Sequence, residues 1–122
     1  MKLILFLVLL ICRSIQLILE HEILTKNEIT ILLKKELPNL KTAFGVKRIG
    51  IFGSYSKGVQ KEDSDVDIIV EFEKPIGLKF IELSDYIEKA LGKKVDILTP
   101  AGIKSIRVKE VAEDIRKSIE YV

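Results

Sequence analysis

The stretch 49–72 predicts two strands joined by a tight turn and a polar loop, with the sequence IGIFGSYSKGVQKEDSDVDIIVEF. The first strand ends at Gly53-Ser54, and the second strand begins with Asp65 and Asp67. Because successive side chains of a strand point to opposite faces, aspartates two positions apart share one face. If the Gly-Ser turn opens a short helix, this acidic face looks back at the turn. The stretch therefore predicts a site for a phosphate and a metal ion.

The composition limits the chemistry that this chain can perform. A length of 122 residues and a hydrophobic fraction of 48% favour one globular domain with one core. The formal net charge of +2 gives no reason to expect a nucleic-acid or membrane partner. The single cysteine, Cys12, excludes an intramolecular disulfide, and the single histidine, His21, leaves no zinc cluster and no histidine-based triad. Carboxylates, hydroxyls and cations must therefore carry the chemistry.

An apolar leader occupies residues 1–23, in which the run LILFLVLLIC follows Lys2 and is ended by Arg13. An export signal or a membrane anchor would account for this run, but it is shorter than the roughly 20 apolar residues that span a bilayer. No small-x-small cleavage pattern follows it. An additional apolar helix would account for it equally well, as would a reading frame assigned too far upstream. We place the leader outside the domain and expect a cytoplasmic protein.

A domain is predicted to start at Leu24, where two signals of a helix N-terminus coincide. Thr25 and Glu28 have the spacing of a capping box, and Leu24 and Ile29 have the spacing of a hydrophobic staple. The helix that begins here is expected to break or kink at Pro38 and to be followed by a shorter turn before the first strand.

Strands and helices alternate along the rest of the chain. The strands are expected over 46–52, 65–72 and 94–98, and the helices over 78–91 and 103–119. This alternation, without an internal repeat or a low-complexity linker, predicts a single α/β domain over residues 24–122.

The acidic face of the second strand is expected to be half site and half core, because Ile69 follows Asp65 and Asp67 on it. A further aspartate, Asp96, lies on the predicted strand after the next helix. Carboxylate oxygens are the ligands that Mg²⁺ prefers, with substrate phosphates completing its coordination. We therefore predict that Asp65, Asp67 and Asp96 bind Mg²⁺ and act in catalysis.

The Gly-Ser turn is expected to bind the phosphates of a nucleoside triphosphate. Gly53 lets a phosphate approach the backbone, Ser54 adds a hydroxyl, and the start of a helix favours anions. Lys57 lies one helical turn beyond Ser54, so its ammonium can reach the same phosphates. Two Mg²⁺ ions about 4 Å apart can bracket a reacting phosphorus, one activating the attacking hydroxyl and the other holding the pyrophosphate.

Each of these features has an ordinary structural role when it is taken singly. A Gly-Ser pair is a common turn, aspartates at alternate positions often mark a solvated strand edge, and a lysine is usually solvated. The combination is more specific, because ten residues separate Ser54 from Asp65 and a further strand aspartate follows. This constellation favours catalysis or nucleotide binding.

The segment GSYSKGVQKEDSDVDIIVEF, with KRIGIF before it and KKVDILTP after it, resembles the minimal nucleotidyltransferases of the DNA polymerase β-like superfamily. More narrowly, the chain is similar to the MNT-type antitoxins that pair with HEPN-domain toxins, over about residues 24–122. The family pattern of Gly-Ser and a later Asp-x-Asp is met here, and Asp96 stands where the third carboxylate is expected. Lys57 departs from the arginine that is more usual in the family, which keeps the charge but loses bidentate phosphate binding.

The resemblance implies a nucleotidyltransferase fold, with a small mixed sheet flanked by helices. It also implies transfer of AMP from ATP to a tyrosine of a HEPN toxin, so that the chain acts as an antitoxin. Asp96 is the expected activator of the attacking hydroxyl. About a hundred residues leave little surface to enclose a small acceptor, so a partner protein is expected to present it. Two rival functions remain: nucleotidyl transfer to a small molecule, and neutralisation of a partner by binding alone.

Overall fold

The computed structural model describes residues 24–122, and the predicted leader lies outside them. Along the chain the elements are α2 (Lys26–Phe44), β1 (Val46–Phe52), α3 (Gly53–Lys57), β2 (Val66–Phe72), α4 (Lys79–Leu91), β3 (Val95–Leu98), α5 (Pro100–Lys104), α6 (Lys109–Ser118) and β4 (Glu120–Tyr121). The alternation of helices and strands expected from the sequence is confirmed.

The strands form one mixed sheet in the order β3-β2-β1-β4. β1 pairs antiparallel with β2 and with β4, whereas β2 and β3 run parallel. The end of β1 therefore meets the beginnings of β2 and β3 at the same edge of the sheet. At this edge Phe52 lies opposite Asp67, and Asp67 lies beside Asp96.

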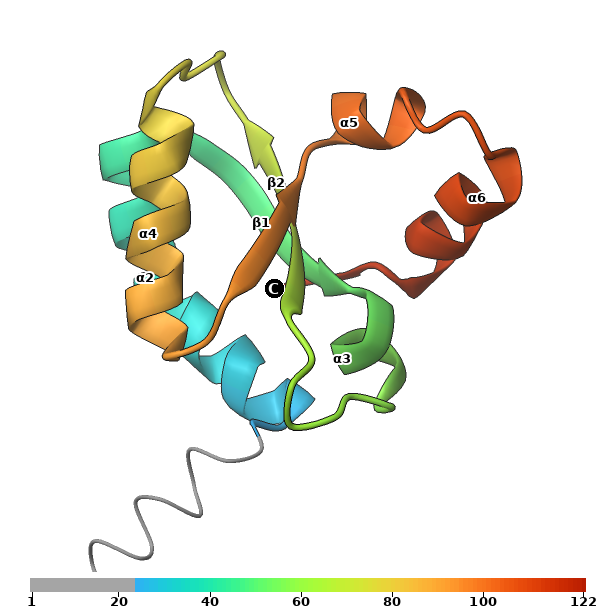
Figure 1. Cartoon of the computed structure of the whole chain (residues 1–122). Coiled ribbons are helices and arrows are strands. Elements are labelled where there is room, and N and C mark those ends of the chain that lie inside the picture. Colours follow the sequence, from blue (N-terminus) through green and yellow to red (C-terminus); the bar gives the residue numbers. More distant parts are fainter. Residues whose placement is uncertain (1–23) are drawn as a thin grey trace, which may run out of the picture.

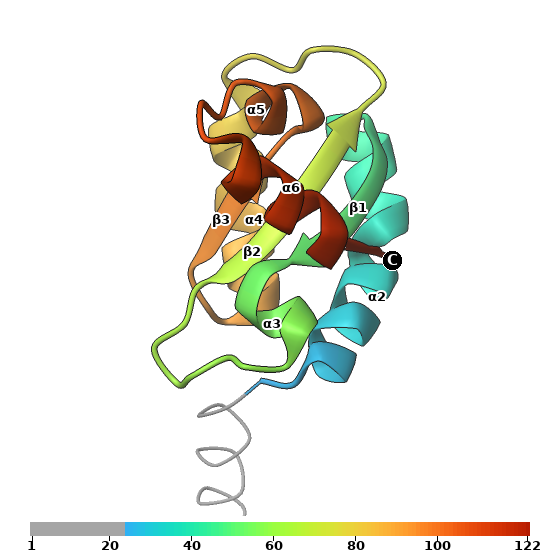
Figure 2. The ribbon, with the colours of Figure 1, turned by 90° about the vertical axis from the view of Figure 1, so that its right-hand side faces the viewer.

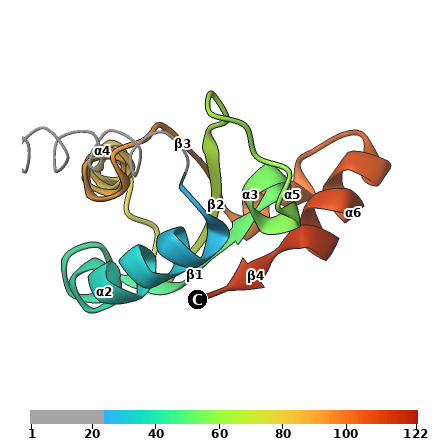
Figure 3. The same ribbon diagram turned by 90° about the horizontal axis from the view of Figure 1, so that it is seen from below.

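Helices cover both faces of the sheet (Figure 1). Turned by 90°, the molecule shows α6 in front of β1 and β2 (Figure 2). α2 and α4 lie on one face and α5 and α6 on the other, and the view from below shows the same separation (Figure 3). The structure is thus the predicted mixed sheet flanked by helices.

The larger core lies between the sheet and the pair α2 and α4. Alternate residues of the two central strands point into it, as period-two patterning requires. It includes Ile29, Leu33, Leu40, Ile49, Ile51, Val66, Ile68, Val70, Leu83 and Ile87. Burial of each such aliphatic side chain contributes about 1.5–3 kcal/mol, so this face fixes the register of β1 and β2.

The helix α2 starts as predicted but does not end at Pro38. Thr25 accepts a hydrogen bond from the backbone N–H of Glu28 at 3.2 Å, and Leu24 and Ile29 are both buried in the larger core. The predicted break at Pro38 is wrong, since the helix continues through Pro38 to Phe44. The apolar residue Leu40, which lies beyond the proline, is completely buried, and this packing retains the last turns of the helix.

The single helix predicted over 103–119 is wrong as well. The chain forms two shorter helices there, and Thr99 caps the first one by accepting a hydrogen bond from Gly102 N–H at 3.1 Å. The turn between the helices lets residues of both pack on the same apolar patch of the sheet, which is why the chain bends. The strand β4, which the sequence pattern did not predict, follows and pairs with β1.

Within residues 24–122, none of the helices is long and apolar enough to cross a membrane.

Candidate active site

The Gly-Ser turn joins the end of β1 directly to α3. Gly53 has a φ of +71°, which L side chains rarely adopt. A Cβ atom added at Gly53 would lie 2.2 Å from Oδ2 of Asp67. The turn and the strand aspartate are therefore in close contact, as the sequence predicted, and a side chain at position 53 would have to displace the carboxylate of Asp67.

Three aspartates lie near the same edge of the sheet, with Asp67 and Asp96 on one face and Asp65 just before the first residue of β2. Asp67 pairs with Asp96 in the parallel register of β2 and β3, and Asp65 lies two positions before Asp67. Asp65 and Asp96 are exposed, whereas Asp67 is partly buried. The topology thus gathers the predicted carboxylates beside the Gly53-Ser54 turn.

The electrostatics of Asp67 reflect this arrangement. The pKa of Asp67 is raised from its ordinary value of 3.8 to about 6, chiefly by burial and also by the negative charges of Asp96 and Asp65. The three carboxylates therefore repel one another in the absence of a cation. A bound cation would offset both the cost of burying the negative charge of Asp67 and its repulsion by Asp96 and Asp65.

Part of the acidic face belongs to the core, as expected. Ile69, two positions beyond Asp67, is buried in a second apolar cluster between the sheet and α5 and α6. The cluster contains Phe52, Ile69, Ile103 and Ala112, with Leu98, Ile106, Ile115 and Ile119 packed against it. Ile69 thus anchors β2 in this cluster, whereas Asp67 lies nearer the edge of the sheet.

The donor set fits Mg²⁺ together with a phosphorylated substrate better than a metal enclosed by protein alone. Among the described residues, no group of three His, Cys, Asp or Glu side chains is placed to hold a metal ion by itself. Mg²⁺ typically takes one or two carboxylates and completes its coordination with water and substrate phosphates. Asp67 and its two acidic neighbours can provide that share of the ligands.

Ser54 and Lys57 occupy opposite ends of α3. Ser54 directly follows Gly53 in the turn and is partly buried. Lys57 lies in the last turn and lines a hollow of about 260 Å³ together with Asp114 and Lys117 of α6. The structure therefore places Ser54 next to the glycine that contacts Asp67, whereas Lys57 lies beside α6.

One residue in contact with the turn was missed by sequence reasoning. Ser118, at the end of α6, accepts a hydrogen bond from the backbone N–H of Gly53 at 3.1 Å. Its signal in the sequence is weak: it is a polar residue between Ile115 and Ile119, on the apolar stripe of the C-terminal helix. A buried serine on such a stripe requires a hydrogen-bond partner.

Comparison with known proteins gives a consistent result. Residues 33–122 match the family model described as a nucleotidyltransferase domain. The chain is 47% identical over 100 residues to the protein adenylyltransferase MntA of Thermococcus cleftensis, covering 81% of this chain and 97% of the relative.

Solved structures show the same fold. One is a candidate minimal nucleotidyltransferase, with a TM-score of 0.62 and 26% identity, covering 80% of this chain and 95% of that one. Another is a toxin-antitoxin complex with AMP-PNP, with a TM-score of 0.53 and 26% identity, covering 80% of this chain and 72% of that one.

Proposed function

Because this chain belongs to the nucleotidyltransferase domain family, we propose that it is a protein adenylyltransferase that transfers AMP from ATP to a partner toxin. The acceptor is the hydroxyl of a tyrosine in a HEPN-domain toxin, and the transfer silences that toxin. The kinship with the Thermococcus adenylyltransferase supports the reaction, and the fold shared with a toxin-antitoxin complex supports the role.

The contact between Gly53 and Asp67 is the observation that carries the proposal. A Cβ atom added at Gly53 would lie 2.2 Å from Oδ2 of Asp67, so the turn lies directly against the acidic edge of the sheet. An enzyme that joins a nucleotide to an acceptor needs phosphate-binding groups and carboxylates in this proximity.

In the proposed mechanism, the Gly53-Ser54 turn binds the triphosphate through the backbone and the hydroxyl of Ser54. Asp65, Asp67 and Asp96 would hold Mg²⁺, which when bound lowers the pKa of an attacking hydroxyl and stabilises a pyrophosphate leaving group. Asp96, which like Asp65 is exposed, accepts the proton of the tyrosine hydroxyl as that oxygen attacks the α-phosphorus. The new bond joins tyrosine oxygen to AMP, and pyrophosphate leaves.

Lys57 has a secondary place in this mechanism. Its position at the end of α3, beside Lys117, suits the outer phosphates of ATP better than the reacting one. The lysine provides a positive charge but no bidentate contact, so it contributes to affinity for ATP and not to the chemical step.

The test is incubation of the protein with labelled ATP, Mg²⁺ and the product of the neighbouring gene. We expect label on a tyrosine of the partner, its loss in Asp67→Asn, and its retention in Asp85→Asn. Asp85 is an exposed aspartate on α4 and serves as the matched control. A tight complex that forms without label would contradict the proposal and favour an antitoxin that acts by binding alone.

A further inference from the structure

We propose that Ser118 is a positioning residue that holds the Gly53-Ser54 turn in its active geometry. This inference rests on the proposed function, because it assigns a role within that same site. Ser118 belongs to α6, 65 positions away from Gly53 in the sequence. It makes the C-terminal segment of the chain part of the active site.

The hydroxyl of Ser118 is fixed by two hydrogen bonds. It donates to the carbonyl of Ile115 at 2.9 Å, which directs its lone pairs away from α6. It accepts from the backbone N–H of Gly53 at 3.1 Å. The side chain is only 9% exposed, so water cannot easily replace either partner.

A second hydrogen bond joins the same two segments. The hydroxyl of Ser56, in α3, donates to the backbone carbonyl of Ser118. The first and the fourth residues of α3 are therefore both attached to the last residue of α6. The two hydrogen bonds thus join both the start and the later part of this short helix to the end of α6.

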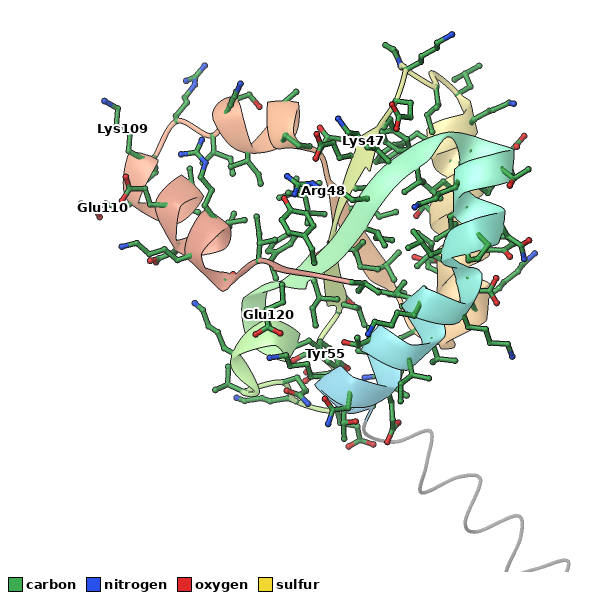
Figure 4. All side chains as sticks on the ribbon, turned by 180° about the vertical axis from the view of Figure 1, so that it is seen from behind. Lys47, Arg48, Tyr55, Lys109, Glu110 and Glu120 are labelled. Carbon is green, nitrogen blue, oxygen red and sulfur yellow. The ribbon has the colours of Figure 1, made fainter. Side chains whose placement is uncertain are left out.

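The end of α6 is itself anchored to the sheet. After Ser118 the chain enters β4, where Glu120 and Tyr121 pair with Ile51 and Gly50 of β1. The approach is close, since a Cβ atom added at Gly50 would lie 2.8 Å from the carbonyl oxygen of Glu120. Figure 4 shows Glu120 beside α3, at the same end of the molecule as Tyr55. The pairing of β4 with β1 therefore fixes the backbone directly after Ser118.

The hydrogen bond between Gly53 and Ser118 limits which groups of the turn can bind a phosphate. The N–H of Gly53 is used within the protein, so a phosphate must be bound by the groups that follow it in the turn, above all those of Ser54. Without Ser118 this N–H would turn toward other acceptors, and the turn would move relative to Asp67. A displacement of about 1 Å in a positioned group can lower a rate about a hundredfold.

The principal test compares Ser118→Ala with Ser105→Ala. Ser105 is the matched control, because it follows the last turn of α5 and its hydroxyl donates to the carbonyl three residues earlier, that of Gly102, at 2.8 Å. Unlike Ser118, Ser105 is exposed. We expect Ser118→Ala to lower kcat/KM for ATP ten- to hundredfold, while its affinity for the partner protein stays within twofold. Ser105→Ala is expected to stay within twofold in both.

Two further variants separate positioning from folding. Ser118→Thr keeps the hydroxyl and is expected to restore kcat/KM to within about threefold of the wild type. Ser56→Ala removes the other attachment and is expected to lower kcat/KM two- to fivefold. Equal kcat/KM values for Ser118→Ala, Ser56→Ala and Ser105→Ala would overturn the proposal.

A measurement without substrate distinguishes failure of this inference from failure of the proposed function. Hydrogen exchange of the Gly53 amide, followed by NMR in the free protein, is expected to accelerate at least tenfold in Ser118→Ala and to remain unchanged in Ser105→Ala. Unchanged exchange in Ser118→Ala would overturn the inference even if AMP transfer is found. A wild-type protein that transfers no AMP would overturn the proposed function, with the exchange result still reporting on the hydrogen bond.

Discussion

Gly53 and Asp67 are packed so closely that the identity of one restricts the other. In Gly53→Ala, the new Cβ atom would lie 2.2 Å from Oδ2 of Asp67, and the positive φ would cost about 1–2 kcal/mol in addition. We therefore expect Gly53→Ala to displace the carboxylate and to lower AMP transfer at least a hundredfold, measured with labelled ATP and the partner.

Gly45→Ala is the control for this substitution. Gly45 ends α2 with a φ of +67°, and a Cβ atom added there would meet nothing within 4 Å. Both variants carry the same backbone cost of about 1–2 kcal/mol, and Gly53→Ala must also displace Asp67. Urea unfolding should therefore show a loss in both variants that is larger in Gly53→Ala, and only Gly53→Ala should lose activity. Equal activity in the two variants would show that Asp67 can move without consequence.

The raised pKa of Asp67 predicts that this site lowers the stability of the metal-free protein. The pKa is about 6 in the folded chain and close to 3.8 in the unfolded chain, so between these values the folded state binds the proton more tightly. The contribution of Asp67 to stability is therefore fully present below about pH 4, is lost as the pH rises through about 6, and stays low above it.

Asp67→Asn removes this pH dependence and is expected to be more stable than the wild type at pH 7. The gain should be about 1 kcal/mol, less than the roughly 3 kcal/mol that the full pKa difference represents, because Asp67 is partly open to solvent. The measurement is urea unfolding at pH 4, 5, 6 and 7 with a chelator, beside Asp85→Asn. A lower stability of Asp67→Asn at pH 7 would contradict the cost inferred from burial of the Asp67 carboxylate and from the charges of Asp96 and Asp65.

At the scale of the element, the start of α2 depends on a local signal. Thr25 accepts a hydrogen bond from Glu28 N–H, so Thr25→Ala should lower the free energy of unfolding by about 1 kcal/mol. Thr30, one turn later, donates to the carbonyl of Lys26 within the same helix and caps nothing. Thr30→Ala should therefore be close to neutral in the same urea titration, and an equal loss in both variants would argue against the cap.

Elements with local signals are also those that the sequence predicts well. The turn at Gly53, the cap at Thr25 and the alternation of β2 each depend on a few neighbouring residues, so their types and positions could be read from the chain. The continuation of α2 through Pro38 could not, because burial of Leu40 in the tertiary core outweighs the cost of the proline.

The C-terminal region shows the same limit at longer range. The break between α5 and α6 and the pairing of β4 with β1 depend on contacts across the sheet, which periodicity does not contain. The periodicity places Val111 on the apolar stripe of one long helix, but Val111 is 48% exposed, and Ala112 is buried instead. The contact of Ser118 with Gly53 was missed for the same reason, since the position of α6 had to be known first.

At the scale of the whole molecule, residues 24–122 contain both apolar clusters and the complete acidic edge. Leu24 closes the larger core at 7% exposure, and its carbonyl accepts a hydrogen bond from the side-chain amide of Gln60 at 3.3 Å. The contacts described above for the candidate site are all made among residues 24–122. We propose that this part of the chain is an independent folding unit.

A fragment that begins at Leu24 is therefore expected to fold cooperatively and to bind ATP with Mg²⁺ as tightly as the full chain does. A fragment that begins at Lys26 is the control, because it lacks the buried Leu24 and the cap of Thr25, together worth about 3 kcal/mol. For about a hundred residues this loss lowers the thermal midpoint by more than about 10 °C. Calorimetry of both fragments decides the point: aggregation of the longer fragment, or equal midpoints for the two, would mean that the domain does not begin where its helix cap and its core place it.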